Sequence, residues 1–192
     1  LDLVTGSKRK IGGEGKGRYQ SVQMTKEGSI GYMLTDVDTN TIGLYHFEPE
    51  HPAIMPLVID SQWDLVEAIL SPDESQLAYV VNEGGIYSLY LFDIDAKQSS
   101  KIDRIPRGII ASMKWLDDEQ LIMVLNSPSM SGDLFRYDIR RDELQRLTHF
   151  GQPEQMESLL RHPELRSFTS FDQLEVPYFY DQPRTPVTLV VG

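Results

Sequence analysis

Cysteine is absent from this sequence, basic residues are scarce and long apolar runs are missing. Without cysteine, the protein has no disulfide bond, no thiolate nucleophile and no cysteine-ligated zinc site. No apolar run approaches the ~18 residues needed to span a bilayer, and no signal-peptide pattern opens the sequence. Lys and Arg number 18 against 29 Asp and Glu, so the net charge is -11 at pH 7. We therefore expect neither nucleic acid nor a membrane as a partner.

What is present is the composition of an ordinary folded protein. Of the 192 residues, 40% are hydrophobic and 24% are charged, which is far from the composition of disordered chains. Because residue 1 is leucine and not an initiator methionine, we expect the sequence to begin inside a longer protein. This leaves the compartment and the oligomeric state open, although the lack of a targeting segment favours the cytoplasm.

An internal repeat of about 45 residues organises the chain. A segment of the form Leu-aromatic-x-aromatic-acid occurs at 44–48, 89–93 and 134–138, so that successive leucines are 45 residues apart. A second motif, Asp-Glu-Ser-Gln-Leu at 73–77, returns as Asp-Asp-Glu-Gln-Leu at 117–121, which is 44 residues later. Two independent motifs with one period predict a repeat architecture in which each unit packs on the next.

Each repeat contains four short segments of strand-forming residues, separated by turns of hairpin length. The predicted strands are 19–25, 29–35, 42–47 and 54–59 in the first repeat, 65–70, 76–82, 86–93 and 101–104 in the second, and 109–115, 120–125, 132–138 and 143–148 in the third. Four short strands in about 45 residues make the sheet of a β-propeller blade. A β-sandwich is the competing architecture, but sandwiches rarely keep so strict a period.

The prediction is thus an all-β fold, a partial β-propeller of four-stranded antiparallel blades in residues 1–150. The complete blades are 19–60, 61–105 and 106–150, and strand-like residues before them, including 8–11, predict the outer half of another blade. A closed propeller has about four to eight blades. Three blades leave two apolar faces without a partner, so either other segments close the ring or the chain is part of something larger.

The repeat stops after residue 150, and a different pattern follows. Residues 151–164 are predicted as a linker with a short helical turn, and 165–180 as a hairpin around a turn at 170–173. A Pro-rich loop at 181–186 leads to a β-branched run at 187–192. Such a run is typical of a strand buried on both faces in an α/β sheet.

These motifs resemble known proteins. Ser-Pro-Asp-x-x-x-Leu-Ala-Tyr-Val and Leu-Tyr-x-x-Asp resemble, generically, the blades of TolB-like and peptidase propellers. More specifically, 171–177 and 186–192 resemble the passage from propeller to α/β-hydrolase domain in the prolyl oligopeptidase family of serine peptidases, which includes dipeptidyl and acylaminoacyl peptidases. The resemblance covers the whole chain and implies that residues 165–192 are the opening strands of the α/β-hydrolase domain.

The sequence also departs from the family pattern. Gln173 stands where the turn of the hairpin usually has glycine, and Val191 or Gly192 stands where a His or Tyr helps to build the oxyanion hole. No Gly-x-Ser-x-Gly nucleophile motif occurs, and in such hydrolases the acid and the histidine follow that motif in chain order. The resemblance therefore implies no catalytic residue here, and we expect this chain alone to be inactive.

For the whole protein, the resemblance implies a serine peptidase that hydrolyses short peptides through an acyl-enzyme. No cofactor or metal is implied. The propeller would gate access of the substrate, so its partners would be a short peptide and the protein's own downstream hydrolase domain. A non-enzymatic TolB-like propeller that serves as an interaction scaffold is the alternative, and a hydrolase acting on esters is a third possibility.

Several other patterns partly resemble ligand sites, but their residues fit structural roles better. Asp36-x-Asp38-x-Asn40 begins like a calcium loop, but Thr41 and Phe47 stand where that loop needs Gly and bidentate Glu. The histidines lack the spacing of a metal site; they are His46, His51, His149 and His162.

Glycines at 12–17 lack the spacing of a phosphate loop and favour a connector between blades. A small basic cluster surrounds them and suits a solvated loop better than a nucleic-acid site; it comprises Lys8, Arg9, Lys10, Lys16 and Arg18. Trp63 and Trp115 are expected to pack in the blades.

Overall fold

The structure is a computed structural model. It describes residues 5–6, 8, 10–12, 15–37, 39–51, 53–60, 62–127, 130–150 and 163–180. These residues form three four-stranded antiparallel sheets and one two-stranded sheet. In each four-stranded sheet the strands lie side by side in chain order, which is the meander of a propeller blade.

The bounds of the strands follow the predicted repeat. Blade 1 consists of β1 (Tyr19–Met24), β2 (Gly31–Thr35), β3 (Gly43–Phe47) and β4 (Ile54–Val58). Blade 2 consists of β5 (Asp64–Leu70), β6 (Gln76–Glu83), β7 (Ile86–Asp93) and β8 (Gln98–Lys101). Blade 3 consists of β9 (Ile109–Trp115), β10 (Gln120–Ser127), β11 (Met130–Asp138) and β12 (Glu143–Arg146).

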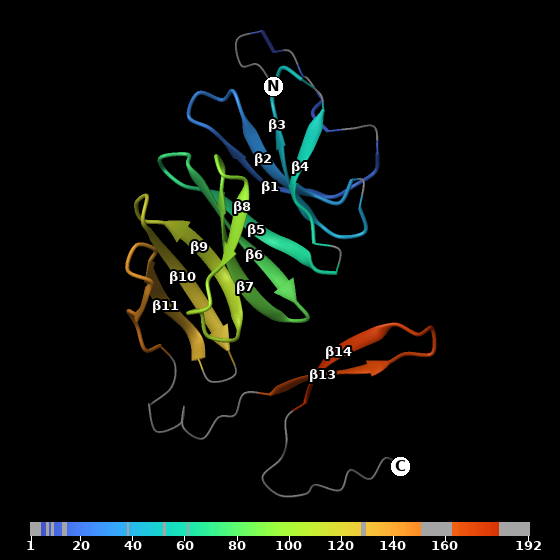
Figure 1. Cartoon of the computed structure of the whole chain (residues 1–192), viewed down its shortest axis with the longest axis vertical. Helices are drawn as coiled ribbons and strands as arrows, with labels where there is room; N and C mark the ends of the chain where they lie inside the picture. Colours follow the sequence, from blue (N-terminus) through green and yellow to red (C-terminus); the bar gives the residue numbers. More distant parts are fainter. Residues whose placement is uncertain are drawn as a thin grey trace, which may run out of the picture.

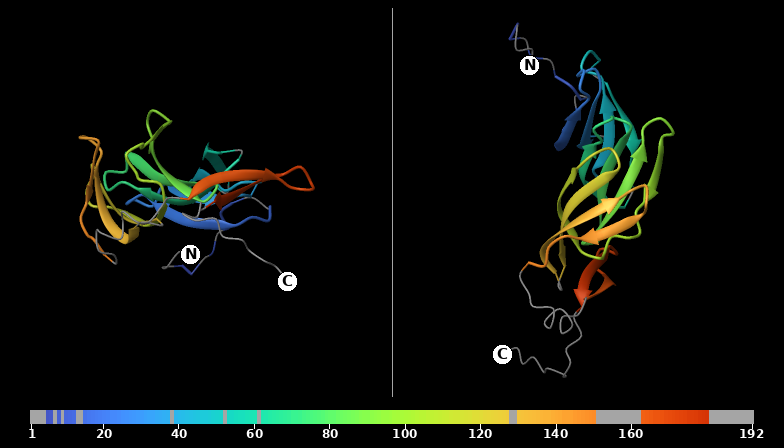
Figure 2. Two further views of the ribbon diagram at one scale, coloured as in Figure 1. Left: turned by 90° about the horizontal axis from the view of Figure 1, so that it is seen from below. Right: turned by 90° about the vertical axis from the view of Figure 1, so that its left-hand side faces the viewer.

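The three blades follow one another through space, with blade 2 in the middle (Figure 1). The first strands lie on the inside of this arrangement, since β1 contacts β5 and β5 contacts β9. Figure 2 shows the same succession from two further directions. Sheets that pack one after another in chain order are blades, so the partial propeller is confirmed and the sandwich is excluded.

The side chains of β6 point alternately to the two faces of the sheet, which explains why blade 2 can pack on both neighbours. Leu77, Tyr79 and Val81 belong to the core shared with blade 1. Ala78 and Val80 point to the opposite face and belong to the core shared with blade 3. A strand with buried residues on both faces is the expected result of a central position.

Both tryptophans pack where the sequence predicted. Trp63 lies against the core between blades 1 and 2. Trp115 lies against the core between blades 2 and 3, and its Nε1 donates a hydrogen bond of 3.2 Å to the carbonyl oxygen of Ile69 on β5.

One predicted strand was placed wrongly. The fourth strand of blade 2 is β8, at Gln98–Lys101, and not at 101–104. The preceding turn is tighter than expected, because Asp93 Oδ1 accepts a hydrogen bond of 2.7 Å from the amide of Ala96. Lys97 then takes a positive φ of 54°, and pairing resumes with Gln98 opposite Asp93.

The strand predicted at 8–11 is also not found, because the described residues Lys8, Lys10 and Ile11 are not in a strand. Ile11 instead packs against buried residues of blade 1, among them Met33 and Tyr45. The earliest residues of the predicted outer half-blade lie outside the described residues, and so do residues 151–162 of the linker predicted at 151–164, the loop at 181–186 and the run at 187–192. Glu164, placed in the linker by the prediction, is the first residue of β13.

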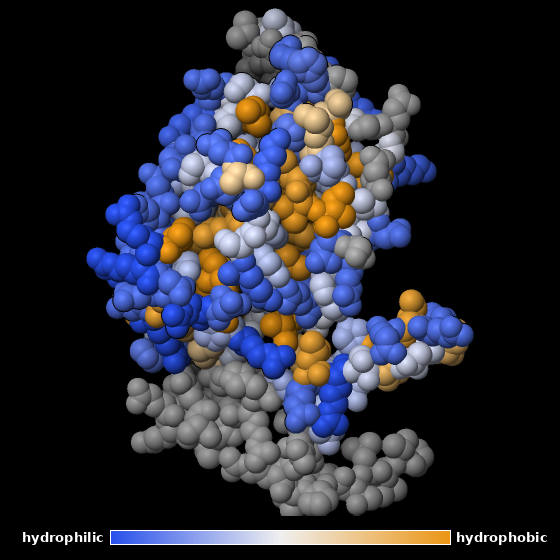
Figure 3. Space-filling view, viewed as in Figure 1, coloured by the Kyte–Doolittle hydropathy of each residue, from blue (hydrophilic) through white to orange (hydrophobic). Residues whose placement is uncertain are grey.

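The two-stranded sheet is the hairpin predicted after the propeller. It consists of β13 (Glu164–Thr169) and β14 (Glu175–Tyr180), paired from Glu164 opposite Tyr180 to Thr169 opposite Glu175. The turn lies where it was expected, since the amide of Gln173 donates to the carbonyl oxygen of Ser170 at 3.0 Å. The hairpin projects from the blades, and hydrophobic residues are visible along it (Figure 3).

Candidate interface between the blades and the hairpin

The hairpin meets the propeller at the tight turn between β6 and β7. Gly84 and Gly85 both have positive φ, 68° and 97°, which is the backbone conformation of a two-residue hairpin turn that favours glycine. A Cβ at Gly84 would lie 3.3 Å from the ring of Trp63 and 3.5 Å from Cβ of Pro177 on β14. The turn therefore brings one end of the two central strands of blade 2 against the hairpin.

Register decides which side of the hairpin makes this contact. Leu165 pairs with Phe179 and Ser167 pairs with Pro177, so these four side chains share one face. That face lies toward the Gly84–Gly85 turn. The opposite face carries the tilted ring pair of Phe168 and Tyr178, which are both exposed and whose centroids are 5.9 Å apart.

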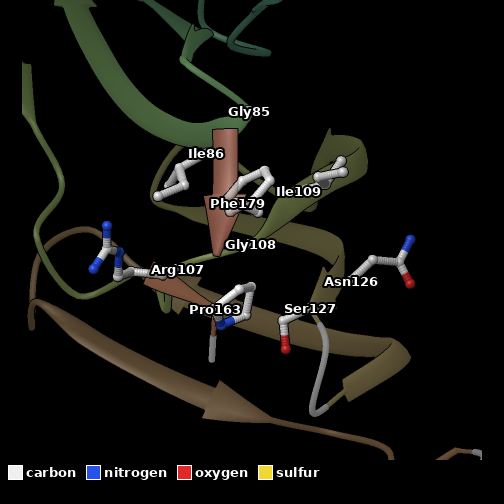
Figure 4. Close-up of a pocket in the computed structure, with 9 residues that line it drawn as sticks. All are labelled: Gly85, Ile86, Arg107, Gly108, Ile109, Asn126, Ser127, Pro163 and Phe179. Atoms are coloured by element: carbon white, nitrogen blue, oxygen red, sulfur yellow. The ribbon is translucent and has the colours of Figure 1, made fainter. Parts of the chain in front are cut away.

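A hollow of about 330 Å³ opens between the hairpin and blades 2 and 3. Figure 4 shows Phe179 in its middle, between Ile86 and Ile109. The polar groups stand at the edge of the hollow in that view; they are Arg107, Asn126 and Ser127. Walls of this kind suit apolar packing with a few orienting polar groups.

A second hollow, of about 420 Å³, is lined by residues of β7, of β8 and of the loop after β8, and it also reaches the hairpin, at Leu165. The carboxylate of Glu83 lies in its wall and accepts hydrogen bonds from three groups. The donors are Ser88 Oγ at 2.8 Å, Tyr90 OH at 2.8 Å and Lys101 Nζ at 3.0 Å. Both carboxylate oxygens of Glu83 thus accept hydrogen bonds from neighbouring side chains.

The ionisation of this cluster follows from its contacts. Burial alone would raise the pKa of Glu83, but the hydrogen bonds from Lys101, Ser88 and Tyr90 outweigh it, so that the pKa is lowered. Burial and the hydrogen bond to Glu83 raise the pKa of Tyr90 to about 12. Tyr90 also stacks on Tyr79, with centroids 5.1 Å apart. A carboxylate locked in this way holds blade 2 together and is not free to act as a base.

Neither hollow carries the groups of a hydrolytic site. Nucleophilic catalysis requires a hydroxyl or thiol beside a base that a third group orients. Ser88 donates instead to Glu83, and none of the residues that line the two hollows is a histidine. The arrangement suits contact between the blades and a neighbouring part of the protein.

The residues considered from the sequence as possible metal ligands lie apart from this interface. His51 contacts Glu48 at 2.9 Å in the turn after β3, and His149 is exposed after β12. Asp36 is occupied, since it accepts hydrogen bonds from the backbone amide and Nε of Arg18. Asp38 and His162 lie outside the described residues.

No group of three or more potential metal ligands occurs among the described residues. Within the same ranges, no helix has the length and apolar character to cross a membrane.

Sequence reasoning missed two features, the contact of Phe179 with Gly85 and the half-buried Glu67 on β5. The first joins residues that are far apart in the sequence, so no local pattern reveals it. The burial of Glu67 does have a sequence signal, because Glu67 is the one charged residue within the apolar run Leu65-Val66-Glu67-Ala68-Ile69.

Comparison with known proteins finds likeness in structure only. No protein-family model and no curated protein matches the sequence. A prolyl endopeptidase superposes with a TM-score of 0.65 at 18% identity, over 85% of this chain and 24% of that one. Prolyl oligopeptidase B from Galerina marginata gives a TM-score of 0.66 at 15% identity, over 85% and 24%.

A puromycin-hydrolyzing peptidase from Mycobacterium tuberculosis gives a TM-score of 0.68 at 13% identity, over 85% of this chain and 25% of that one. The chain thus spans about a quarter of the length of the solved structures that it matches. At these identities the likeness is one of fold. With its repeated blades and its C-terminal hairpin, the chain has the fold of the propeller part of prolyl oligopeptidase-family peptidases.

Proposed function

We propose that the blades are the non-catalytic propeller portion of a serine peptidase that hydrolyses short peptides. The docking of the hairpin on the Gly84–Gly85 turn carries this proposal, because a propeller that served alone as a scaffold would not need a projecting hairpin. The peptidases of like fold support the same assignment. Residues 165–192 would then open the α/β-hydrolase domain.

The mechanism of the whole protein follows from this assignment. An activated serine in the domain after the hairpin would attack the peptide carbonyl, and an acyl-enzyme would form and then be hydrolysed. The blades would supply no reacting group. Their role would be to restrict the space above the catalytic domain, so that short or unfolded peptides enter and folded proteins do not.

The interface described above gives this role a physical basis. The hollow around Phe179 is lined by residues from blade 2, blade 3 and the hairpin. A shift of the hairpin on the blades would therefore change the position of the blades relative to the hydrolase domain that we propose begins with the hairpin. In the prolyl endopeptidase of like fold, inter-domain dynamics have a role in catalysis and specificity.

Hydrolysis of a chromogenic peptide tests the proposal. The complete protein is expected to cleave the peptide, and a serine-directed phosphonate is expected to abolish the activity. The 192-residue chain is expected to cleave nothing under the same conditions. Cleavage by this chain alone, or a complete protein without phosphonate-sensitive hydrolysis, contradicts the proposal and favours the scaffold.

A further inference from the structure

The hollow around Phe179 leaves large apolar side chains open, although the hairpin is docked on the blades. Phe179 is 50% exposed and Ile109 is 44% exposed. Together with Ile86 and Pro163 they line a space of about 330 Å³, which is within the usual size of a small-molecule site, about 300–1,000 Å³. A cavity of this size and character suits an apolar ligand.

The internal repeat shows what fills the same place at the preceding junction. Trp63 stands directly before β5 and Gly108 stands directly before β9, so the two residues occupy equivalent positions, 45 residues apart. Between blades 1 and 2, the side chain of Trp63 packs against the shared core. Between blades 2 and 3, Gly108 supplies no side chain and borders the hollow. The hollow thus lies where the preceding junction has an aromatic ring.

Backbone contacts keep this position free of a side chain. A Cβ at Gly108 would lie 2.3 Å from the carbonyl oxygen of Asn126, because Ile109 pairs with Asn126 across β9 and β10. The carbonyl oxygen of Gly108 also accepts a hydrogen bond of 2.8 Å from the amide of Tyr87, which ties the start of β9 to blade 2. The hollow is therefore held open by the backbone.

The next residue along the chain changes from polar to apolar between the two junctions. Asp64, after Trp63, uses its carboxylate to accept a hydrogen bond of 2.8 Å from the amide of Ile42. The equivalent residue after Gly108 is Ile109, which lines the hollow with an aliphatic side chain. The second junction has thus lost both the ring and the charge that complete the first.

The walls favour an aromatic ligand over an aliphatic one. Apolar walls offer water few hydrogen-bond partners, and apolar cavities bind small aromatic molecules. The ring of Phe179 stands between Ile86 and Ile109 (Figure 4), and aromatic rings prefer offset-stacked or edge-to-face contact with one another. Arg107 and Asn126, at the edge of the hollow, can donate hydrogen bonds to a polar substituent.

We propose that the hollow around Phe179 binds a small aromatic compound of the size of an indole, in the place that corresponds to Trp63 at the preceding junction. The inference goes beyond the proposed function, because it requires no hydrolysis. Since the walls come from blade 2, blade 3 and the hairpin, a ligand in the hollow would also stabilise the docked hairpin.

An NMR titration of the 192-residue chain tests the proposal. The probe is 2-naphthol, compared with its saturated counterpart decahydro-2-naphthol. An aromatic pair contributes about 0.5–1.5 kcal/mol beyond the buried area, so 2-naphthol is expected to bind about two- to tenfold more tightly. Its signals of contact are expected at Gly85, Gly108 and the ring of Phe179. Shifts confined to other residues, or equal affinity of the two compounds, overturn the proposal.

Variants that fill the hollow place the effect. Ile109→Trp fills it from β9 and Ile86→Trp fills it from β7, on the other side of Phe179, so each is expected to abolish binding of 2-naphthol. Ile59→Trp is the matched control, because Ile59 is an equally exposed isoleucine, at 45%, that lies away from the hollow. Circular dichroism establishes that each variant is folded. Equal binding to all three variants, or loss of binding in the control as well, shows that the hollow is not the site.

The complete protein distinguishes a ligand site from an internal contact. Under the proposal, the complete protein also binds 2-naphthol, and the compound slows amide exchange in β13 and β14. If the 192-residue chain binds the compound and the complete protein does not, a side chain of the remaining protein fills the hollow and the proposal is wrong. Binding is expected whether or not the complete protein hydrolyses peptides, so the failure of one proposal leaves the other standing.

Discussion

The ring of Phe179 on the hairpin lies directly over Gly85 of blade 2. A Cβ at Gly85 would be 2.8 Å from Cε2 of Phe179, closer than side-chain atoms approach one another. The missing side chain of one residue thus makes room for the ring of another that is 94 positions later in the sequence. This contact joins the propeller to the segment that follows it.

Gly85→Ala is expected to loosen the hairpin. The variant places a methyl group against Phe179 and imposes a positive φ of 97° on alanine, so hydrogen exchange of the backbone amides in β13 and β14 should accelerate. Gly28→Ala is the control, because Gly28 also has a positive φ, of 70°, but nothing within 4 Å of an added Cβ.

Gly28→Ala should lose about 1–2 kcal/mol of stability, because alanine is held in the left-handed region, and Gly85→Ala should lose at least as much, because its φ of 97° lies beyond that region. Only Gly85→Ala should change exchange in the hairpin. Equal exchange of the hairpin in the two variants would show that Phe179 does not depend on Gly85.

Gln173→Gly is expected to stabilise the hairpin. Gln173 has a positive φ of 67° in the turn between β13 and β14, a conformation that costs a residue with a side chain about 1–2 kcal/mol. Glycine removes that cost, so amide exchange in the hairpin should slow. Gln98→Gly in the regular strand β8 is the control and should destabilise blade 2, because glycine weakens strands. Faster exchange in Gln173→Gly than in the wild type is the outcome that counts against the turn as described.

Asp133 is expected to make blade 3 sensitive to acid. Its side chain is fully buried and accepts hydrogen bonds from Arg146 Nη2 at 2.5 Å and from the amide of Phe150 at 2.6 Å. Burial alone would raise the pKa of Asp133, but the bonds from Phe150, Arg146 and Thr148 lower it overall. The stabilisation is therefore present above the unfolded pKa of about 3.9 and is lost as pH falls through the lower folded value.

Asp133→Asn removes the buried charge that accepts hydrogen bonds from Arg146 and the amide of Phe150, which should cost about 3 kcal/mol at pH 7. The gap in urea midpoint between wild type and variant should narrow as pH falls below about 4. Asp118→Asn, at an exposed position, is the control and should be nearly neutral. A gap that stays constant from pH 7 to pH 3 would exclude the ionised Asp133 as its source.

The sequence predicted the blades well because their pattern is local. Leu44, Leu89 and Leu134 recur in the third strand of each blade, and turn residues mark the strand ends. The same approach misplaced the fourth strand of blade 2, since Lys97 adopts a positive φ that no glycine or asparagine announces. The predicted strand was centred on the aliphatic residue Ile102, which lies just beyond β8.

The candidate sites were less predictable because they depend on contacts between blades. Glu67 looks like a solvent-facing strand residue until the bulge at Val66 and the two neighbouring blades enclose it. The hollow at Phe179 likewise joins residues of β7, β9 and β14, which no short-range pattern connects.

Selectivity for substrate size tests the central claim, that these blades restrict access to a peptidase. The measurement compares cleavage by the complete protein of one target sequence, presented first as a short free peptide and then within an exposed loop of a folded carrier protein. Under the proposal, the short peptide is cleaved and the same sequence in the carrier is left intact. Cleavage of both at similar rates, or of neither, would contradict it.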